Sequence, residues 1–250
     1  MTQVAGRTLE NIIGPLTESF PQLDHSTIQH GAQIHNDRIN AEEPLRTELR
    51  SASFYTADFA LYRVKENGVI LYLAKGEDNL IFDNIGEATA QLLKTKNYVP
   101  CKEGIDKVVK SVTIVRINLS NVRLKELEGV EAFKGEISYL EIDTNNYANL
   151  NEDEKKLAGV IYGQGNEFQK NMNSLNENGI KQARICVLNP GYVRENAPQY
   201  GAIARACRLS FFECDAGFDA AGRSVGNRSF HLRGVPNTAT ANYSTNQPKQ

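Results

Sequence analysis

The sequence contains no tryptophan and only two methionines among its 250 residues. The absence of tryptophan argues against folds whose cores depend on that side chain. No stretch reaches the roughly 18 uninterrupted apolar residues of a membrane span. The N-terminal MTQVAGRTLENIIGPL carries acidic and amide residues where a signal peptide would have a longer apolar core. These absences predict a soluble, cytoplasmic chain without a membrane span.

The chain also lacks a strong net charge and a cysteine framework. Its formal charge is −2 and its pI about 6.1, so no global basic field is available to hold nucleic acid. Its four cysteines, Cys101, Cys186, Cys207 and Cys214, have no CxxC spacing, which favours reduced thiols over disulfides. With 40% hydrophobic and 23% charged residues, the chain is expected to fold as one or two domains.

One absence is local. From Gly201 to Asn246 there is no Lys, Gln, Met or Trp, and Glu213 is the only Glu. Residues 1–200 contain 41 Lys, Glu and Gln, so a window of this length should hold about nine. Burial by itself does not explain the difference, because it would also remove the Arg and Asp that the window contains.

The alternation of strand-forming residues predicts an α+β fold. The segments FALYRV and VILYLA flank Asn67 and Gly68, a pair suited to a tight antiparallel hairpin in the first half of the chain. Further strands are expected over 111–119, 136–143 and 183–188. The C-terminal half is therefore expected to mix helices and strands.

The helices are expected from apolar periodicity and capping residues. They cover 8–20, 85–96, either one helix or a broken pair of helices over 150–179, and a last helix around 198–212, whereas Pro21 to Glu48 is expected to be a polar arm or loop. This organisation gives four regions: 1–50 as N-terminal helix and arm, 51–128 as hairpin, helix and strand, 129–235 as mixed α/β, and 236–250 as a disordered tail.

Three histidines fall at intervals of five, at His25, His30 and His35. Such spacing places successive side chains about 140° apart on a helix and on alternating faces of a strand. Neither element would aim all three at one metal, so we expect solvated loop histidines.

Two acids in one strand offer an alternative function. Glu141 and Asp143 would share a strand face and, with Glu136 or Asp106, could hold a divalent cation for chemistry on a nucleotide or phosphodiester. Strand ends also commonly carry solvated acids. A metal-dependent α/β enzyme is the alternative to a binding protein, and a non-catalytic interaction subunit is a second alternative.

Two glycine motifs match known strings without their structural context. Residues 222–226, GRSVG, match the nucleophile elbow but have no apolar strand before them and no acidic residue after Ser224. Residues 163–166, GQGN, lie inside a helical pattern, which favours a kink or a close helix contact over a phosphate loop.

The remaining ligand types also lack a suitable spacing. Cys207, Cys214, Asp215 and His231 could bind zinc, but the six residues between the cysteines exceed the usual two to four, so structural thiols are expected. We predict no metal and no cofactor.

The genetic code offers a reason for the local absence. A codon that ends in cytosine and varies at its first two bases encodes Asn, Asp, Ser, Tyr, Arg, Gly and Ala, but never Lys, Gln, Glu, Met or Trp. With this composition, residues 209–235 resemble the variable regions of target proteins of diversity-generating retroelements. That resemblance implies a ligand-binding surface, with a C-type-lectin-like scaffold at the C-terminus.

The same resemblance divides the segment into framework and displayed positions. The framework would comprise Phe218, Ala220, Arg223, Val225 and the LRGV of 232–235. The displayed binding positions would be Cys214, Asp215, Gly217, Asp219, Ala221, Gly222, Ser224, Gly226, Asn227, Arg228, Ser229, Phe230 and His231. We therefore expect a binding protein that presents a diversified C-terminal surface to an unknown protein or small-molecule ligand.

Overall fold

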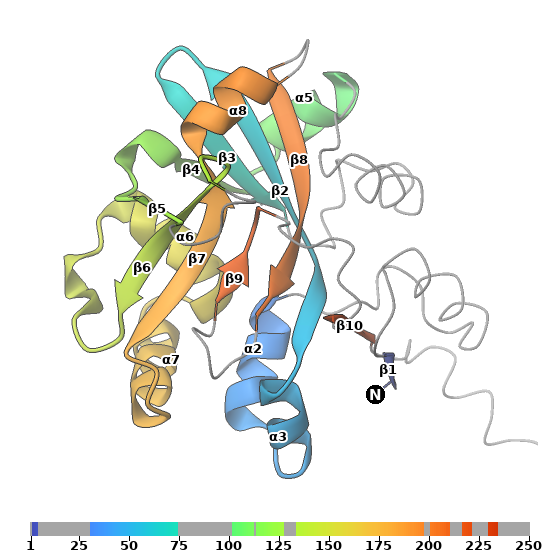
Figure 1. Ribbon diagram of the computed structural model, residues 1–250, viewed down its shortest axis with the longest axis vertical. Coiled ribbons are helices and arrows are strands. Elements are labelled where there is room, and N and C mark those ends of the chain that lie inside the picture. Colours follow the sequence, from blue (N-terminus) through green and yellow to red (C-terminus); the bar gives the residue numbers. More distant parts are fainter. Residues whose placement is uncertain are drawn as a thin grey trace, which may run out of the picture.

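The computed structural model describes residues 2–4, 31–74, 102–112, 114–127, 134–197, 201–210, 217–221 and 230–234 (Figure 1). The helices are α2 (Gly31–Asn40), α3 (Leu45–Arg50), α5 (Lys102–Lys110), α6 (Glu152–Tyr162), α7 (Asn166–Glu177) and α8 (Pro190–Asn196), with 3-10 turns η3 (Leu119–Asn121) and η5 (Tyr147–Asn149). The strands are β1 (Thr2–Val4), β2 (Ser53–Lys65), β3 (Gly68–Ala74), β4 (Val115–Asn118), β5 (Lys125–Glu126), β6 (Ile137–Asp143), β7 (Gln182–Leu188), β8 (Ala202–Leu209), β9 (Phe218–Asp219) and β10 (Phe230–Gly234).

All the strands belong to one mixed sheet. Its order is β1-β10-β2-β8-β9-β7-β6-β5, with β3 pairing β2 and β4. β2 and β3 form the antiparallel hairpin, which turns at Gly68 with a φ of 127°. Only glycine adopts that backbone conformation without strain. The α+β class and the hairpin expected from the sequence are confirmed.

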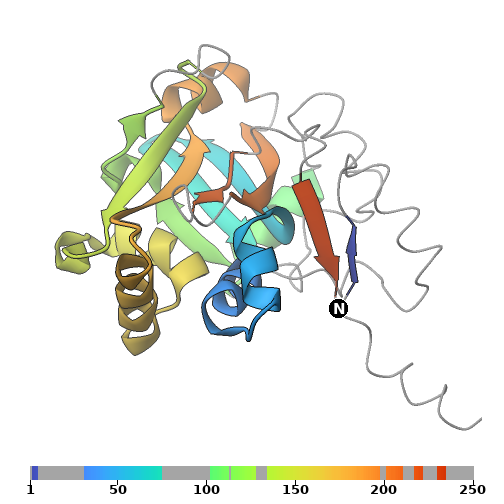
Figure 2. The same ribbon diagram turned by 60° about the horizontal axis from the view of Figure 1, so that its bottom comes forward.

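The sheet buries apolar side chains on both of its faces. Along β2, Ala60 and Tyr62 belong to the larger core, whereas Phe59 and Leu61 belong to a second, smaller one beneath α5. This alternation follows from the two-residue period of a strand. In Figure 2 the blue helices α2 and α3 and the yellow to brown helices α6 and α7 lie together along one side of the sheet.

The stretch expected to be a polar arm contains α2 and α3. Arg38, fully buried, joins them: its Nε donates to Leu49 O at 2.9 Å and its Nη2 to Ala52 O at 2.5 Å. The polarity of this stretch was misleading because a buried guanidinium stabilises the two helices through backbone carbonyls.

His35 also differs from the expectation of a solvated loop histidine. It lies in α2 with no exposed surface, edge-on to the ring of Tyr162 at 4.9 Å between centroids. Burial, and then the charge of Arg38, lower the pKa of His35 to about 3. This imidazole is therefore neutral at physiological pH. His25 and His30 lie outside the described residues.

The expected helix around 198–212 is wrong, because Ala202–Leu209 forms strand β8. β8 lies between β2 and β9 in the sheet and pairs antiparallel with both. Alanine and arginine favour helix in isolation, but the sheet hydrogen bonds and burial on both faces override that preference.

The other expected elements are found where the structure describes them. β4 and β6 lie within the first two predicted strands, and β7 coincides with the third. Of the two alternatives over 150–179, the structure has the broken pair, α6 and α7. The predicted helices over 8–20 and 85–96 lie outside the described residues. Within the described part of the chain, no helix is both long and apolar enough to cross a membrane.

Candidate functional site

The C-terminal segment is fixed at its middle by five residues, 217–221, which we call the anchor segment. All five are buried, and Phe218, Asp219 and Ala221 are each at most 1% exposed. The anchor segment divides the candidate binding region into residues 211–216 before it and 222–229 after it. Its contacts therefore determine where the first stretch ends and where the second begins.

Backbone pairing holds the anchor segment from both sides. Phe218 pairs with Leu209 of β8 on one side and with Ile185 of β7 on the other. Ala220 N donates to Cys186 O at 2.9 Å, and Ser210 N donates to Gly217 O at 2.9 Å. The short strand β9 thereby joins the two halves of the sheet.

A buried ion pair fixes Asp219. Nε of Arg208 lies 2.6 Å from Oδ2 of Asp219, and the two side chains are only 9% and 1% exposed. Oδ1 of Asp219 accepts a hydrogen bond from Ala221 N at 2.9 Å. Both carboxylate oxygens are thus engaged within the fold, and burying the pair is tolerated because each charge is compensated.

Arg205 holds the end of the anchor segment. Its guanidinium is fully buried, with Nη1 donating to Ala221 O at 2.9 Å and Nη2 to Glu136 Oε1 at 2.9 Å. The hydroxyl of Tyr192 accepts a further hydrogen bond from Nη2 at 3.4 Å. One arginine therefore connects the anchor segment to the beginning of β6 and to α8.

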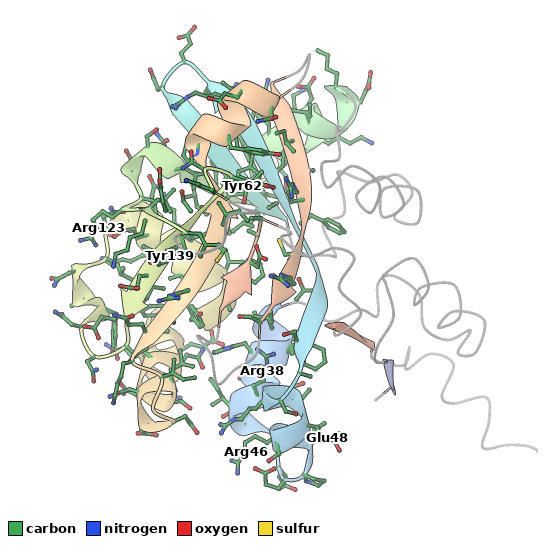
Figure 3. The ribbon with its side chains drawn as sticks, in the orientation of Figure 1. Arg38, Arg46, Glu48, Tyr62, Arg123 and Tyr139 are labelled. Carbon is green, nitrogen blue, oxygen red and sulfur yellow. The ribbon has the colours of Figure 1, made fainter. Side chains whose placement is uncertain are left out.

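Tyr62 contributes a hydroxyl from β2 near the centre of the sheet (Figure 3). That hydroxyl donates to Ala220 O and accepts from Leu188 N, both at 3.2 Å. Burial raises the pKa of Tyr62 well above its ordinary value, so the hydroxyl stays protonated and able to donate.

The beginning of α2 packs against the anchor segment. A Cβ at Gly31 would lie 3.2 Å from Cε2 of Phe218, 3.2 Å from Oδ2 of Asp58 and 3.1 Å from Cδ1 of Ile161. Gly31 N also donates to the buried carboxylate of Asp58 at 2.6 Å. Glycine at this position therefore allows α2 to approach the ring of Phe218 closely.

After residues 222–229 the chain enters β10. Phe230–Leu232 pair in parallel with Ser53–Tyr55 of β2, and β1 pairs antiparallel with β10 on its other side (Figure 2). The eight residues from Gly222 to Ser229 therefore connect the anchor segment to β10, and both of these belong to the same sheet.

The predicted binding positions fall into three groups. Gly217, Asp219 and Ala221 lie in the anchor segment and are buried, which is at odds with a displayed role. Phe230 and His231 lie in β10. The other predicted positions lie outside the described residues: Cys214, Asp215, Gly222, Ser224, Gly226, Asn227, Arg228 and Ser229.

Sequence reasoning missed the side chains that hold the anchor segment. They come from distant parts of the chain: Tyr62, Glu136, Tyr192, Arg205 and Arg208. The available signal was the pair of arginines within the otherwise apolar AIARACRL, because an arginine in a buried strand requires acidic or carbonyl partners.

The acids of the alternative metal site do not come together. Oε1 of Glu141 lies 2.6 Å from Nζ of Lys125, Oε2 of Glu141 lies 3.7 Å from Nη2 of Arg184, and Asp143 accepts a hydrogen bond from Asn145 N. Glu136 is engaged by Arg205. Among the described residues, no group of three or more His, Cys, Asp or Glu side chains is placed to hold a metal ion.

The zinc hypothesis can be followed only at Cys207 within the described side chains. This thiol is free and buried, and burial, followed by the charges of Asp58 and Asp219, raises its pKa well above the ordinary value. A thiol with a raised pKa stays protonated, which suits packing better than metal ligation. Cys214 and Asp215 lie outside the described residues.

Comparison with known proteins gives one relationship, at the level of structure. No protein-family model and no curated protein matches the chain. A solved structure from work on how the C-type lectin fold accommodates massive sequence variation in Nanoarchaeota matches with a TM-score of 0.51 at 10% identity. The match covers 93% of this chain and 97% of that one, so the similarity is not confined to the C-terminus. The chain has a fold similar to that C-type lectin fold.

Proposed function

We propose that this chain is a binding protein whose recognition surface is formed by residues 211–216 and 222–231 and varies between otherwise similar chains. The observation that carries the proposal is the anchor segment. Its five residues are buried and hydrogen-bonded to β2, β7 and β8, while the stretches on either side of it have the composition of recognition loops.

The buried framework explains part of the missing residue types. Residues 201–210 and 217–221 are mostly buried, where Lys, Glu and Gln are rare, and Arg205 and Arg208 persist there because they are paired. The rest of the window, 211–216 and 222–246, still holds one Lys, Glu or Gln where residues 1–200 predict about six. For these positions we retain the explanation from the genetic code, in which codons ending in cytosine vary at their first two bases.

The anchor segment also narrows the set of displayed positions. Gly217, Asp219 and Ala221 are engaged inside the fold, and we therefore assign them to the framework together with Phe218 and Ala220. The proposed displayed set is Cys214, Asp215, Gly222, Ser224, Gly226, Asn227, Arg228, Ser229, Phe230 and His231.

Two further observations support the proposal. The solved structure with a similar fold comes from a study of how the C-type lectin fold accommodates massive sequence variation in Nanoarchaeota. Phe, Tyr and Arg supply contact energy in recognition surfaces, and Ser, Gly and Asn adapt to the partner. Residues 222–231 contain Arg223, Arg228 and Phe230 alongside three glycines or asparagines in the stretch GRSVGN. The ligand is proposed to be a protein or a small molecule.

The deciding experiment is sequencing of this locus in many closely related isolates. We expect substitutions to concentrate at the displayed set, with 217–221 and 232–235 constant. We also expect a second, nearly identical copy of this DNA segment nearby, with adenines at the codon positions that vary. Invariant residues 211–231 without such a repeat would overturn the proposal.

A protein-level experiment tests the same division between framework and displayed positions. Asn227→Tyr, Arg228→Ser and Ser229→Phe combined should change the free energy of unfolding by about 0.5 kcal/mol or less, as expected for surface substitutions. Ala221→Tyr, in the anchor segment, should cost about 1–3 kcal/mol or more because it overpacks a buried position. Equal costs in the two variants would contradict the assignment.

A further inference from the structure

We propose that a cleft between η5, α6 and α7 binds a phosphate monoester that carries an aromatic ring. The cleft has a volume of about 480 Å³, within the usual range of small-ligand sites. Its lining includes Tyr147, Glu152, Lys155, Lys156, Gln164 and Phe168. The proposal is independent of the recognition surface, because none of these elements contributes to the C-terminal segment.

Two half-buried rings form an apolar wall. Tyr147 of η5 and Phe168 of α7 pack edge to face with centroids 5.3 Å apart, and Phe168 lies 6.5 Å from the buried ring of Tyr162. The wall is thus backed by the larger core, which both rings flank. Partly exposed rings on a rigid backing offer a stacking surface for a planar ligand.

Two adjacent lysines give the cleft positive charge. Lys155 and Lys156 face the single acid Glu152 in the lining, although the whole chain has a net charge of −2. Both lysine side chains are more than half exposed. Two cations beside one another match the two charges of a phosphate monoester better than the single charge of a carboxylate.

The present partners of these lysines hold them weakly. Nζ of Lys156 lies 3.5 Å from Oδ1 of Asp153, whose other oxygen accepts from Asn121 Nδ2 at 2.7 Å. Nζ of Lys155 lies 3.1 Å from Oε1 of Glu152, which is 82% exposed. Exposed ion pairs contribute little, so Lys155 can turn toward a bound phosphate at low cost. Asp153 is only 14% exposed, but it keeps its hydrogen bond from Asn121 when Lys156 turns.

The glycine-containing turn between α6 and α7 completes the lining. Gly163 and Gly165 have φ angles of 76° and 56°, which bring the start of α7 beside the end of α6. Gln164, between them, lies over Gly159: a Cβ there would be 3.1 Å from Cγ of Gln164. The amide of Gln164 can donate to or accept from a polar ligand group.

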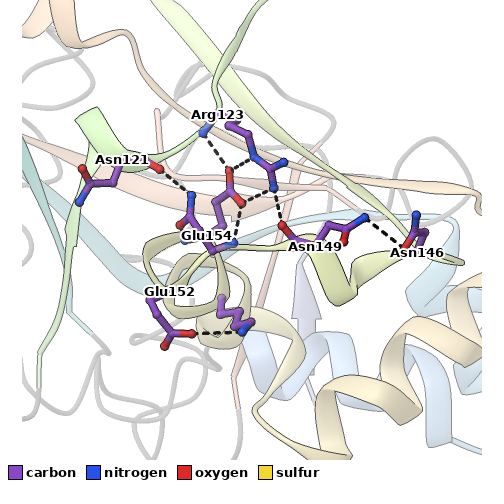
Figure 4. A network of polar contacts seen from close by, with 8 residues as sticks. Asn121, Arg123, Asn146, Asn149, Glu152 and Glu154 are labelled. Carbon is purple, nitrogen blue, oxygen red and sulfur yellow. Dashed lines mark hydrogen bonds and ion pairs between the residues drawn. The ribbon is translucent and has the colours of Figure 1, made fainter.

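A polar network around the buried Glu154 side chain holds the α6 wall in place (Figure 4). Glu154, whose side chain is fully buried, accepts from Arg123 Nε at 2.8 Å and from Arg123 Nη2 at 2.6 Å. Asn151 and Glu154 also form a reciprocal capping box at the start of α6. The two lysine side chains are therefore exposed groups on a helix that is held firmly in the fold, and sites built on rigid elements are the more precise ones.

Adenosine monophosphate serves as the probe, with adenosine and inorganic phosphate as partial ligands. Titration calorimetry and saturation-transfer NMR on the full chain should show the monophosphate binding about tenfold or more tightly than either partial ligand. Lys155→Gln combined with Lys156→Gln should weaken binding about tenfold, and Phe168→Leu should weaken it and reduce transfer to the base protons.

Lys170→Gln combined with Lys181→Gln is the matched control, because it removes the same charge from exposed positions outside the cleft. Gln164→Ala provides a second test in case Phe168→Leu fails to fold. No binding of the monophosphate, equal binding of adenosine, or equal losses in the cleft and control variants would overturn the proposal.

Discussion

Arg208 and Asp219 illustrate how a single buried charge depends on its partner. Arg208→Met removes the cation that lies 2.6 Å from the buried Asp219 carboxylate, so we expect the free energy of unfolding to fall by about 3–5 kcal/mol. Denaturant unfolding followed by far-UV circular dichroism measures it, because the chain has no tryptophan to report by fluorescence.

The double variant Arg208→Met, Asp219→Asn tests the cause. The side-chain amide oxygen that replaces the carboxylate can still accept from Ala221 N while the uncompensated charge is gone, so part of the loss should be recovered. A double variant as unstable as the sum of the two single variants would indicate that the pair is not coupled.

His35 is expected to make the fold sensitive to acid. Its pKa is about 3 when folded and about 6.5 when unfolded, so between these values the unfolded chain binds more protons and stability falls as pH falls. The slope should approach 1.4 kcal/mol per pH unit at most. Denaturant unfolding between pH 4.5 and 7.5 measures it.

Substitution identifies the group responsible. His35→Gln should flatten the profile between pH 4.5 and 6.5. Glu154 does not contribute to this slope, because hydrogen bonding to Arg123 lowers its pKa to about 2. Its contribution to the free energy of unfolding is lost only as the pH falls below about 4.5. An unchanged profile in His35→Gln would contradict the assignment.

At the scale of an element, the turn between α6 and α7 depends on glycine. Gly163→Ala and Gly165→Ala should each cost about 1–3 kcal/mol, because positive φ angles strain any residue with a Cβ. Gly159→Ala, inside α6, should instead be neutral or stabilising by up to about 1 kcal/mol. Thermal and denaturant unfolding compare the three.

A further substitution separates the cost of backbone strain from the cost of a steric clash between side chains. A Cβ at Gly163 would meet the exposed side chain of Glu167, which can rotate away. Glu167→Ala should therefore not rescue Gly163→Ala. Full rescue would show that the side-chain contact, and not the backbone conformation, sets the cost.

At the scale of the whole molecule, Tyr62 couples three separate parts of the chain. Tyr62→Phe leaves Leu188 N and Ala220 O without this hydroxyl, so we expect a loss of about 1–3 kcal/mol. Hydrogen exchange should accelerate at Leu188 and Ala220 while the amides of the β2–β3 hairpin stay protected. Uniform acceleration across the sheet would contradict local coupling.

The sequence by itself determined the elements whose cause is local. The β2–β3 hairpin follows from alternation around Asn67-Gly68, and the break between α6 and α7 follows from two glycines. The α+β class could be inferred in the same way. Each depends on backbone preferences within a few residues.

Only the tertiary structure decided β8, the environment of His35 and the anchor segment. AIARACRL becomes a strand because β2 and β9 supply its hydrogen bonds, although its composition favours helix. Arg205 and Arg208 find their partners in Glu136 and Asp219, 69 and 11 residues away. Gly217, Asp219 and Ala221, which the family resemblance implied to be displayed, are buried, because strand pairing and the Arg208–Asp219 ion pair hold this segment inside the fold.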